Sequence, residues 1–138
     1  MRVAGLAALV TIGVLILAGC GEIMSPDLFI VYRSGSGPHA RLTMIVSEEG
    51  VVTCNGRKAG RLEDPQIIKA RTIQEDLKDP ASSRLSLAPQ PGSVLRYYVR
   101  EESGSVRFSD NSVHQPAVFR RLALFVLQTS QEVCRLAE

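Results

Sequence analysis

Hydrophobic residues are distributed along this chain in two distinct ways. An uncharged, strongly apolar run extends from Val3 to Leu17, and after residue 26 the apolar positions form shorter runs separated by turn-forming residues. The first run has about fifteen residues, which suits the core of an export signal peptide and falls short of the roughly twenty that a membrane-spanning helix needs. The pattern therefore predicts an N-terminal targeting segment followed by a folded region.

Five of the later runs have the composition of β-strands. In each, β-branched and aromatic residues are bounded by Gly, Pro, Asn, Asp or Ser, as is typical of short strands and tight turns. The five segments are 27–34, 40–48, 51–55, 93–101 and 105–110. The first three are expected to form an antiparallel meander, and the last two a hairpin around Glu102-Ser103-Gly104.

Two further segments have apolar residues at helical spacing. In the first, Asp64 is a good N-cap and Pro65 a good first helical residue, and Asp79-Pro80 is expected to stop the helix. The second spans about residues 116–136, and its wide apolar face makes it the expected central element of the core, with Leu124 extending that face. The order β-β-β-α-β-β-α predicts an α+β fold, an antiparallel sheet of about five strands with both helices on one face.

The other face of this sheet is expected to carry Arg, Thr, Ser and one tyrosine. Tyr97 and Tyr98 are adjacent, so one ring must point to each side of the strand. Such a face is either a binding surface or an ordinary polar sheet face. The segment from Pro80 to Ser93, which contains three prolines and no clear strand or helix pattern, either closes over a site or only connects two elements.

The apolar leader ends in a motif. Leu17-Ala18-Gly19-Cys20 resembles the lipobox of bacterial lipoproteins, in which small residues precede a cysteine that receives a diacylglyceryl group. The resemblance implies that signal peptidase recognises Leu17, Ala18 and Gly19 and removes residues 1–19. Cys20 would then anchor the chain in the bilayer, at the outer face of the cytoplasmic membrane. The alternatives are a secretory signal cut elsewhere and an uncleaved N-terminal membrane helix.

Removing this leader leaves about 120 residues, which is enough for one compact domain. Residues 20–26 would form the lipidated N-terminus and a tether that reaches at most about 20 Å, and residues 27–138 the single domain. The whole chain has 16 basic and 14 acidic residues, and only Arg2 among them lies in the leader. This near balance gives no reason to expect a nucleic acid partner.

The cysteine count agrees with the lipobox. Of three cysteines, Cys20 would be used for lipid, and Cys54 and Cys134 remain. Outside the cytoplasm these two are expected to form one disulfide, with two buried free thiols as the alternative. The bond would close a loop of roughly 80 residues, for which the chain-entropy account suggests about 4–5 kcal/mol of stabilisation.

No catalytic or metal-binding signature is present in the sequence. His39 and His114 lie in separate turn-like segments and lack the spacing of zinc ligands. Asp110 and Ser112 are close to His114 in sequence, but no nucleophile-elbow motif surrounds them. We therefore expect no enzyme activity, no cofactor and no metal, and a hydrolase using the region of His114 is the alternative.

The domain also resembles known families. The runs "YRSGSGPHARLTMIV", "VVTCNG" and "GSVLRYYVR" resemble small exported proteins of actinobacteria, a resemblance that implies no activity. A first strand ending in Arg33-Ser34-Gly35, followed by the hairpin and a Pro-started helix, is similar to emfourins, which inhibit thermolysin-like metalloproteases. The glycine pair of emfourins is matched here by Gly35 and Gly37, split by Ser36.

These observations predict a membrane-anchored lipoprotein with a disulfide-pinned extracytoplasmic domain in a binding or envelope-accessory role. Its partners would be the lipid bilayer, through Cys20, and a protein. The similarity to emfourins implies a metalloprotease inhibitor as the alternative function.

Overall fold

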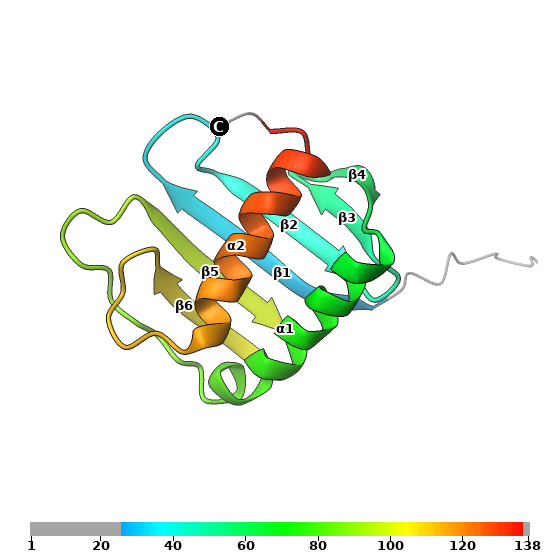
Figure 1. The fold of residues 1–138 in the computed structure, drawn as a ribbon. Coiled ribbons are helices and arrows are strands. Elements are labelled where there is room, and N and C mark those ends of the chain that lie inside the picture. The colour runs from blue at the N-terminus through cyan, green and yellow to red at the C-terminus, as the bar shows by residue number, and fades with distance from the viewer. Residues whose placement is uncertain (1–25, 137–138) are drawn as a thin grey trace, which may run out of the picture.

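A single antiparallel sheet covered by two helices forms the part of the chain that the computed structural model describes, residues 26–136 (Figure 1). The predicted α+β class is confirmed, although the sheet has six strands and not five. In chain order the elements are β1 (Asp27–Gly35), β2 (Leu42–Ser47), β3 (Val51–Cys54), β4 (Arg57–Arg61), α1 (Asp64–Ser82), β5 (Leu95–Glu101), β6 (Gly104–Ser109) and α2 (Ala117–Glu132).

Strand β1 lies inside the sheet, whose order is β4-β3-β2-β1-β5-β6. The meander β1 to β4 therefore continues on one side of β1, and the hairpin β5–β6 pairs on its other side. The register places Tyr32 of β1 opposite Tyr98 of β5, and Tyr98 opposite Arg107 of β6. This long-range pairing of β1 with β5 joins the two halves of the sheet.

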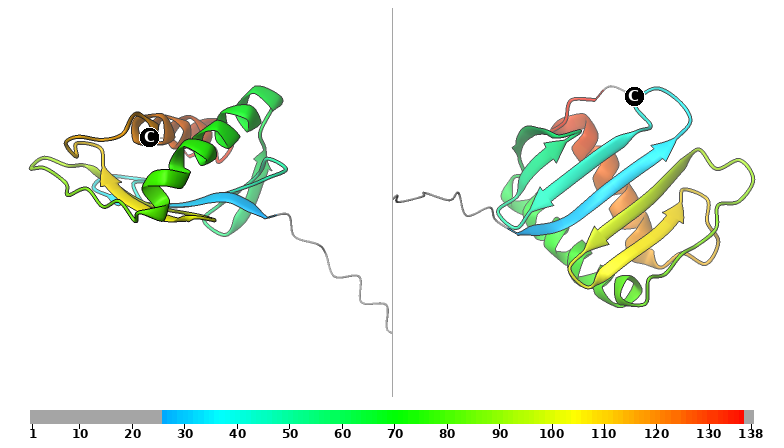
Figure 2. Two further views of the ribbon diagram at one scale, coloured as in Figure 1. Left: turned by 90° about the horizontal axis from the view of Figure 1, so that it is seen from below. Right: turned by 180° about the vertical axis from the view of Figure 1, so that it is seen from behind.

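Both helices pack on the same face of the sheet, as predicted (Figures 1 and 2). The core lies between these layers, and its largest fully buried side chains include Phe29, Met44, Leu77, Phe119 and Leu122. Phe125 of α2 packs edge-on against Phe29, with ring centroids 5.9 Å apart. Burying a side chain of this size contributes roughly 1.5–3 kcal/mol, so α2 is a central core element, as its apolar face predicts.

The sixth strand was missed by the hydrophobic pattern. Residues Arg57–Arg61, "RKAGR", pair with β3 at the edge of the sheet, and their side chains are almost all exposed. An edge strand with no buried face has no apolar alternation to reveal it, and charged residues there discourage pairing with other chains. The predicted connection between β3 and α1 is thus partly a strand.

The helix ends differ from the predicted ones by a few residues. Glu63 is the N-cap of α1 and exchanges hydrogen bonds with Gln66 in a capping box, so Asp64 is already the first helical residue. Pro80 lies inside the last turn and does not stop the helix at Asp79. The second helix ends at Glu132, and Leu124, which is 52% exposed, lies outside the core.

The predicted disulfide between Cys54 and Cys134 is present, with the two Cα atoms 5.9 Å apart. It links the end of β3 to the turn that follows α2, where the Cys134 N–H donates to the carbonyl of Thr129. The bond therefore fastens the C-terminal end of α2 over the meander half of the sheet.

The signal-peptide and lipobox predictions, including Leu17, Ala18, Gly19 and Cys20, concern residues outside the described range. Within residues 26–136, neither helix combines the length and the hydropathy that crossing a membrane requires. The contacts that follow all lie in the domain predicted for residues 27–138.

Candidate functional site

The face of the sheet that no helix covers carries the most distinctive surface of the domain (Figure 2, right). Strand alternation directs the even-numbered residues of β1 from Ile30 onward, the even-numbered residues of β5 and the odd-numbered residues of β6 to this face. The cross-strand rows here are Ser34–Arg96–Ser109, Tyr32–Tyr98–Arg107 and Ile30–Arg100–Ser105. We call Tyr32, Arg96, Tyr98, Arg100 and Arg107 the open-face cluster.

Aromatic stacking organises the middle row of this cluster. The rings of Tyr32 and Tyr98 are nearly parallel, with centroids 5.7 Å apart and an interplanar angle of 21°. The guanidinium carbon of Arg107 lies 4.3 Å from the centroid of the Tyr98 ring, a cation–π contact. Since Tyr97 is buried against Phe108 on the other face, the prediction that the two adjacent tyrosines point to opposite sides is confirmed.

The arginines of the cluster have no carboxylate partner within residues 26–136. The ion pairs of this part of the chain join Lys78 to Glu75 and Arg121 to Asp76, all on the helices. Arg33 differs from the cluster arginines because it is buried and donates to the carbonyls of His39 and Ala40. The exposed guanidinium groups of Arg96, Arg100 and Arg107 are thus available to an anion.

The loop after α1 forms a wall beside the cluster. Ser86 pairs with Arg107 in a parallel bridge, in which the Leu87 N–H donates to the Arg107 carbonyl and the Arg107 N–H to that of Leu85. This pairing occupies the outer edge of β6. The loop therefore does more than connect two elements, a question that the sequence left open.

Two adjoining hollows lie between this wall and the sheet. The first has a volume of about 360 Å³ and is lined by residues that include Tyr32, Arg96, Leu87 and Pro89. The second, of about 540 Å³, is lined by Arg100, Glu101 and Glu102 among others, and it shares Ser86, Tyr98 and Arg107 with the first. Volumes of this order are typical of ligand sites, and the cluster lines both hollows.

Polar side chains after β6 fasten the wall to the sheet. The carboxylate of Asp110 accepts hydrogen bonds from the Ser93 hydroxyl at 2.9 Å and from the Val94 N–H at 3.1 Å. Burial alone would raise the pKa of Asp110, but these hydrogen bonds outweigh it and hold that pKa below its ordinary value of 3.8. The Ser112 hydroxyl donates to the Ala88 carbonyl at 2.9 Å.

Close approach between backbones explains one glycine beside the wall. A Cβ atom on Gly35 would lie 2.0 Å from the carbonyl oxygen of Val94, so only glycine fits there without a shift. Gly35 thus allows the end of β1 to lie against the segment that leads into β5, where the Ser36 N–H donates to the Val94 carbonyl. Gly37, the second glycine of the emfourin resemblance, has open space around it and a φ of +104°.

Two of the residues considered for hydrolysis, Asp110 and Ser112, hydrogen-bond to groups other than His114. Asp110 and Ser112 hold the wall, and among residues 26–136 no hydrogen bond joins either of them to the exposed His114. His39 lies in the turn after β1 and supplies its backbone carbonyl to Arg33. In the described part of the chain no three His, Cys, Asp or Glu side chains are grouped as metal ligands.

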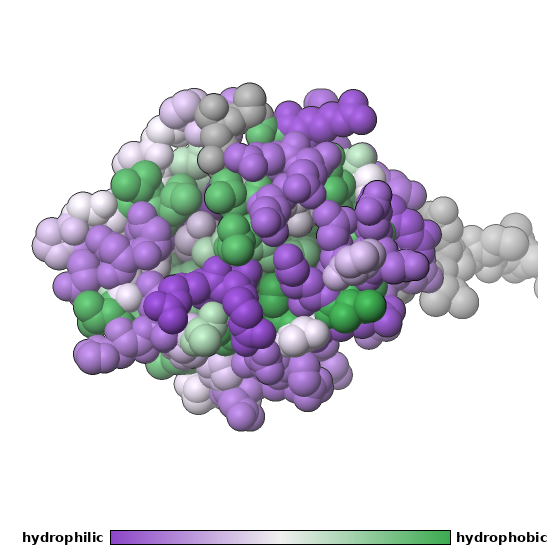
Figure 3. Space-filling view, in the orientation of Figure 1, coloured by the Kyte–Doolittle hydropathy of each residue, from purple (hydrophilic) through white to green (hydrophobic). Residues whose placement is uncertain are grey.

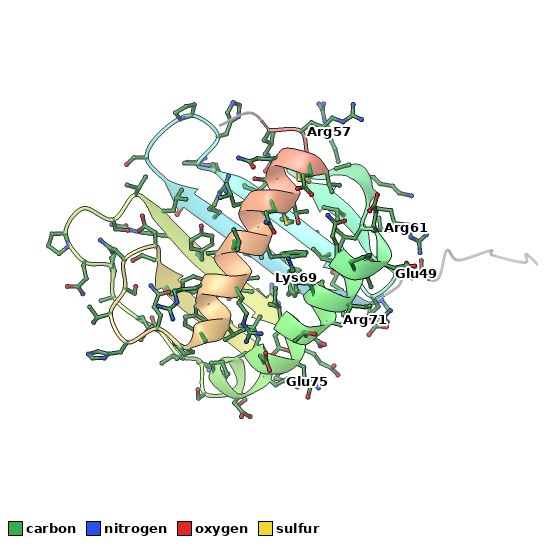
Figure 4. All side chains as sticks on the ribbon, viewed as in Figure 1. Glu49, Arg57, Arg61, Lys69, Arg71 and Glu75 are labelled. Atoms are coloured by element: carbon green, nitrogen blue, oxygen red, sulfur yellow. A yellow bond between two sulfur atoms is a disulfide. The ribbon has the colours of Figure 1, made fainter. Side chains whose placement is uncertain are left out.

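The helix face has a different character from the open face. Hydrophilic side chains cover most of it, and small apolar patches show between them (Figure 3). Figure 4 shows both signs of charge together on this side, with Lys69, Arg71 and Glu75 projecting from α1. The cluster on the open face is instead cationic and aromatic.

The sequence contains a partial signal for the cluster. In "RYYVR", Arg96, Tyr98 and Arg100 alternate with apolar residues, which places all three on one face of a strand. Tyr32, Arg107 and the wall come from other segments and join them only through the tertiary fold. No protein-family model, curated protein or solved structure matches this chain, so its function has to be argued from these contacts.

Proposed function

We propose that the protein is a bacterial lipoprotein held by Cys20 at the outer face of the cytoplasmic membrane, with a domain that binds an anionic partner on its open sheet face. The open-face cluster is the observation that carries the binding role. It combines guanidinium groups that have no carboxylate partner among residues 26–136 with a stacked tyrosine pair beside a walled hollow. Such a surface attracts and orients negative charge.

Two features support the location. Leu17-Ala18-Gly19-Cys20 follows a charged start and an apolar core, in the order that lipoprotein export requires. The Cys54–Cys134 bond is of the kind that persists in oxidising compartments and is rare in the cytosol. Both features support a domain that works outside the cytoplasm.

Binding is favoured over catalysis by what the polar side chains do. The Ser112 hydroxyl and the Asp110 carboxylate, which are the nearest such groups to His114 in sequence, form hydrogen bonds to the wall. A nucleophile has to be within hydrogen-bond reach of its base, and Asp110 and Ser112 hydrogen-bond elsewhere. We therefore assign no catalytic residue.

Replacing Cys20 by Ser tests the anchor. The wild-type chain, expressed in bacteria supplied with an alkyne-tagged fatty acid, should be labelled, processed and recovered with membranes, because the thiol is the site of diacylglyceryl transfer. The Cys20→Ser variant should be unlabelled and keep its leader. A Cys54→Ser/Cys134→Ser variant is the control and should be labelled like the wild type. Labelling of Cys20→Ser, or its correct processing, would contradict the proposal.

A further inference from the structure

We infer that the open-face cluster binds an extended, acidic segment of a protein partner. The inference deepens the proposed binding function and rests on it for the orientation of the domain at the membrane. It follows from the shape of the two hollows, the types of side chain that line them and the distribution of negative charge at their ends.

The shape of the site suits an extended chain. Arg96 and Arg100 are four residues apart on β5, hence about 13 Å apart along the strand, with the Tyr98 ring between them. The adjoining hollows follow this line beside the wall. Because Ser86 already pairs with the edge of β6, the segment would lie across the sheet face and would not add a strand.

The side chains suit a protein ligand with carboxylates. Arg and Tyr are, together with Trp, the residues most enriched at the energetic centres of protein interfaces, whereas Lys is depleted at interfaces, and the cluster contains no Lys. A guanidinium group binds a carboxylate through two parallel hydrogen bonds. Arg96 and Arg107 line the first hollow, whose lining includes no Asp or Glu, so the carboxylates of the segment would bind there and not beside Glu101 and Glu102 in the second hollow. The stacked rings, with Leu87 and Pro89 opposite, would receive an apolar or aromatic side chain of the same segment.

Negative charge at one end of the face argues against the bilayer as the occupant. The chain enters the sheet at Asp27, and a small hollow there is lined by Asp27, Arg100, Glu101 and Glu102. A short tether would keep this end beside the membrane, where three carboxylates repel anionic headgroups. Ser34 and its partner Arg96 lie about 23 Å further along β1, so the first hollow would lie further from the bilayer than this end of the face.

A random-peptide selection tests the inference. The full-length chain in detergent would be used to select displayed decapeptides. We expect the selected peptides to be enriched in Asp or Glu next to an aromatic or apolar residue, and to bind more weakly as salt rises. An Arg96→Ala/Arg107→Ala variant should lose at least about tenfold in affinity for them.

The matched control is Arg57→Ala/Lys69→Ala, which removes the same charge from the helix side of the molecule (Figure 4). It should change the affinity less than about twofold, as expected for charges outside the interface. Unchanged near-ultraviolet circular dichroism of both variants would show that they fold. Three results would each overturn the inference, namely no enrichment of acidic residues, equal losses in the two variants, and a larger loss in the control.

Competition with soluble lipids tests whether the site binds anionic lipid headgroups instead of an acidic protein segment. Soluble dihexanoyl phosphatidylglycerol should not displace a selected peptide more effectively than dihexanoyl phosphatidylcholine. Displacement by the anionic lipid that depends on Arg96 and Arg107 would assign the site to headgroups and overturn the inference. Peptide affinity does not require the anchor, so failed lipidation of Cys20 with intact peptide binding would contradict only the lipoprotein proposal.

Discussion

At the residue scale, the polar side chains of this domain divide into those that hold backbone and those that are left for a ligand. Arg33 and Asp110 both use their charges on backbone groups, Arg33 on the turn after β1 and Asp110 on the wall. Arg96, Arg100 and Arg107, on neighbouring strands, have no such partner in residues 26–136. Residue type alone does not separate these two classes of arginine, but their contacts do.

Asp110 provides a test of how the wall is held. Asp110→Ala should lower the free energy of unfolding by about 1 kcal/mol, because its hydrogen bonds to Ser93 and Val94 are lost at a site open to solvent. Amide hydrogen exchange in residues 84–94 should increase. Glu102→Ala, which removes an exposed carboxylate that accepts no hydrogen bond in residues 26–136, should leave both measurements unchanged.

The same carboxylate predicts a pH dependence with a defined sign. Since hydrogen bonding holds the folded-state pKa of Asp110 below its ordinary value of 3.8, the stabilisation is complete above that pH and is lost as the pH falls through the folded-state pKa. The difference between wild type and Asp110→Ala in urea unfolding should thus shrink below pH 3.8. A difference that grows on acidification would contradict this assignment.

At the element scale, α2 contributes one buried face to the core and leaves the other to solvent. Phe119 is fully buried and stacks on Phe108 of β6 with a centroid distance of 4.4 Å. Leu124, on the same helix, is 52% exposed and, together with Ile73 and Phe125, lines a shallow hollow between the two helices. The apolar pattern of α2 is therefore wider than the face that it buries.

These two residues form a matched pair of substitutions. Phe119→Ala should lower the free energy of unfolding by about 3–5 kcal/mol, because it removes a fully buried ring and leaves a cavity. Leu124→Ala should change it by less than about 1 kcal/mol, because half of the side chain is already in water. Urea denaturation of both variants measures the difference. Similar losses at both positions would show that Leu124 belongs to the core.

At the scale of the whole molecule, one sheet separates two environments. Its covered face holds the core, and its open face presents arginine and tyrosine on the side away from the helices (Figure 2). The Cys54–Cys134 bond lies at the meander end of this architecture and spans 80 positions of sequence. It is thus far from the hairpin strands that carry most of the cluster, and its contribution should be to stability and not to binding.

Removing both cysteines of the bond tests that contribution. Cys54→Ala/Cys134→Ala should lower the free energy of unfolding by about 2–5 kcal/mol, because the unfolded chain gains the freedom of a long loop. Wild-type protein unfolded in the presence of reductant should approach the stability of the variant. Equal unfolding midpoints of the wild type with and without reductant would contradict a stabilising disulfide.

Whether a prediction agrees with the structure depends on whether the interactions involved join neighbouring or distant residues of the chain. Alternating apolar residues predicted the strands with a buried face, and the cysteine count predicted the bond between Cys54 and Cys134. The apolar pattern did not predict strand β4, because its side chains are exposed. Asp79-Pro80 was predicted to end α1, but the last turn of the helix includes Pro80. Local patterns predict an element well only where packing and propensity agree.

The sequence by itself determined the α+β class, the order of the main elements, the pairing of the cysteines and the placement of Tyr97 and Tyr98 on opposite faces of one strand, because these follow from periodicity and composition along the chain. Only the tertiary structure decided that β1 pairs with β5, which stacks Tyr32 on Tyr98, and that residues 85–87 close the edge of β6. Such contacts join segments that are distant in sequence, and their energies depend on the packing of the whole domain. A pattern of neighbouring residues carries no information about that packing.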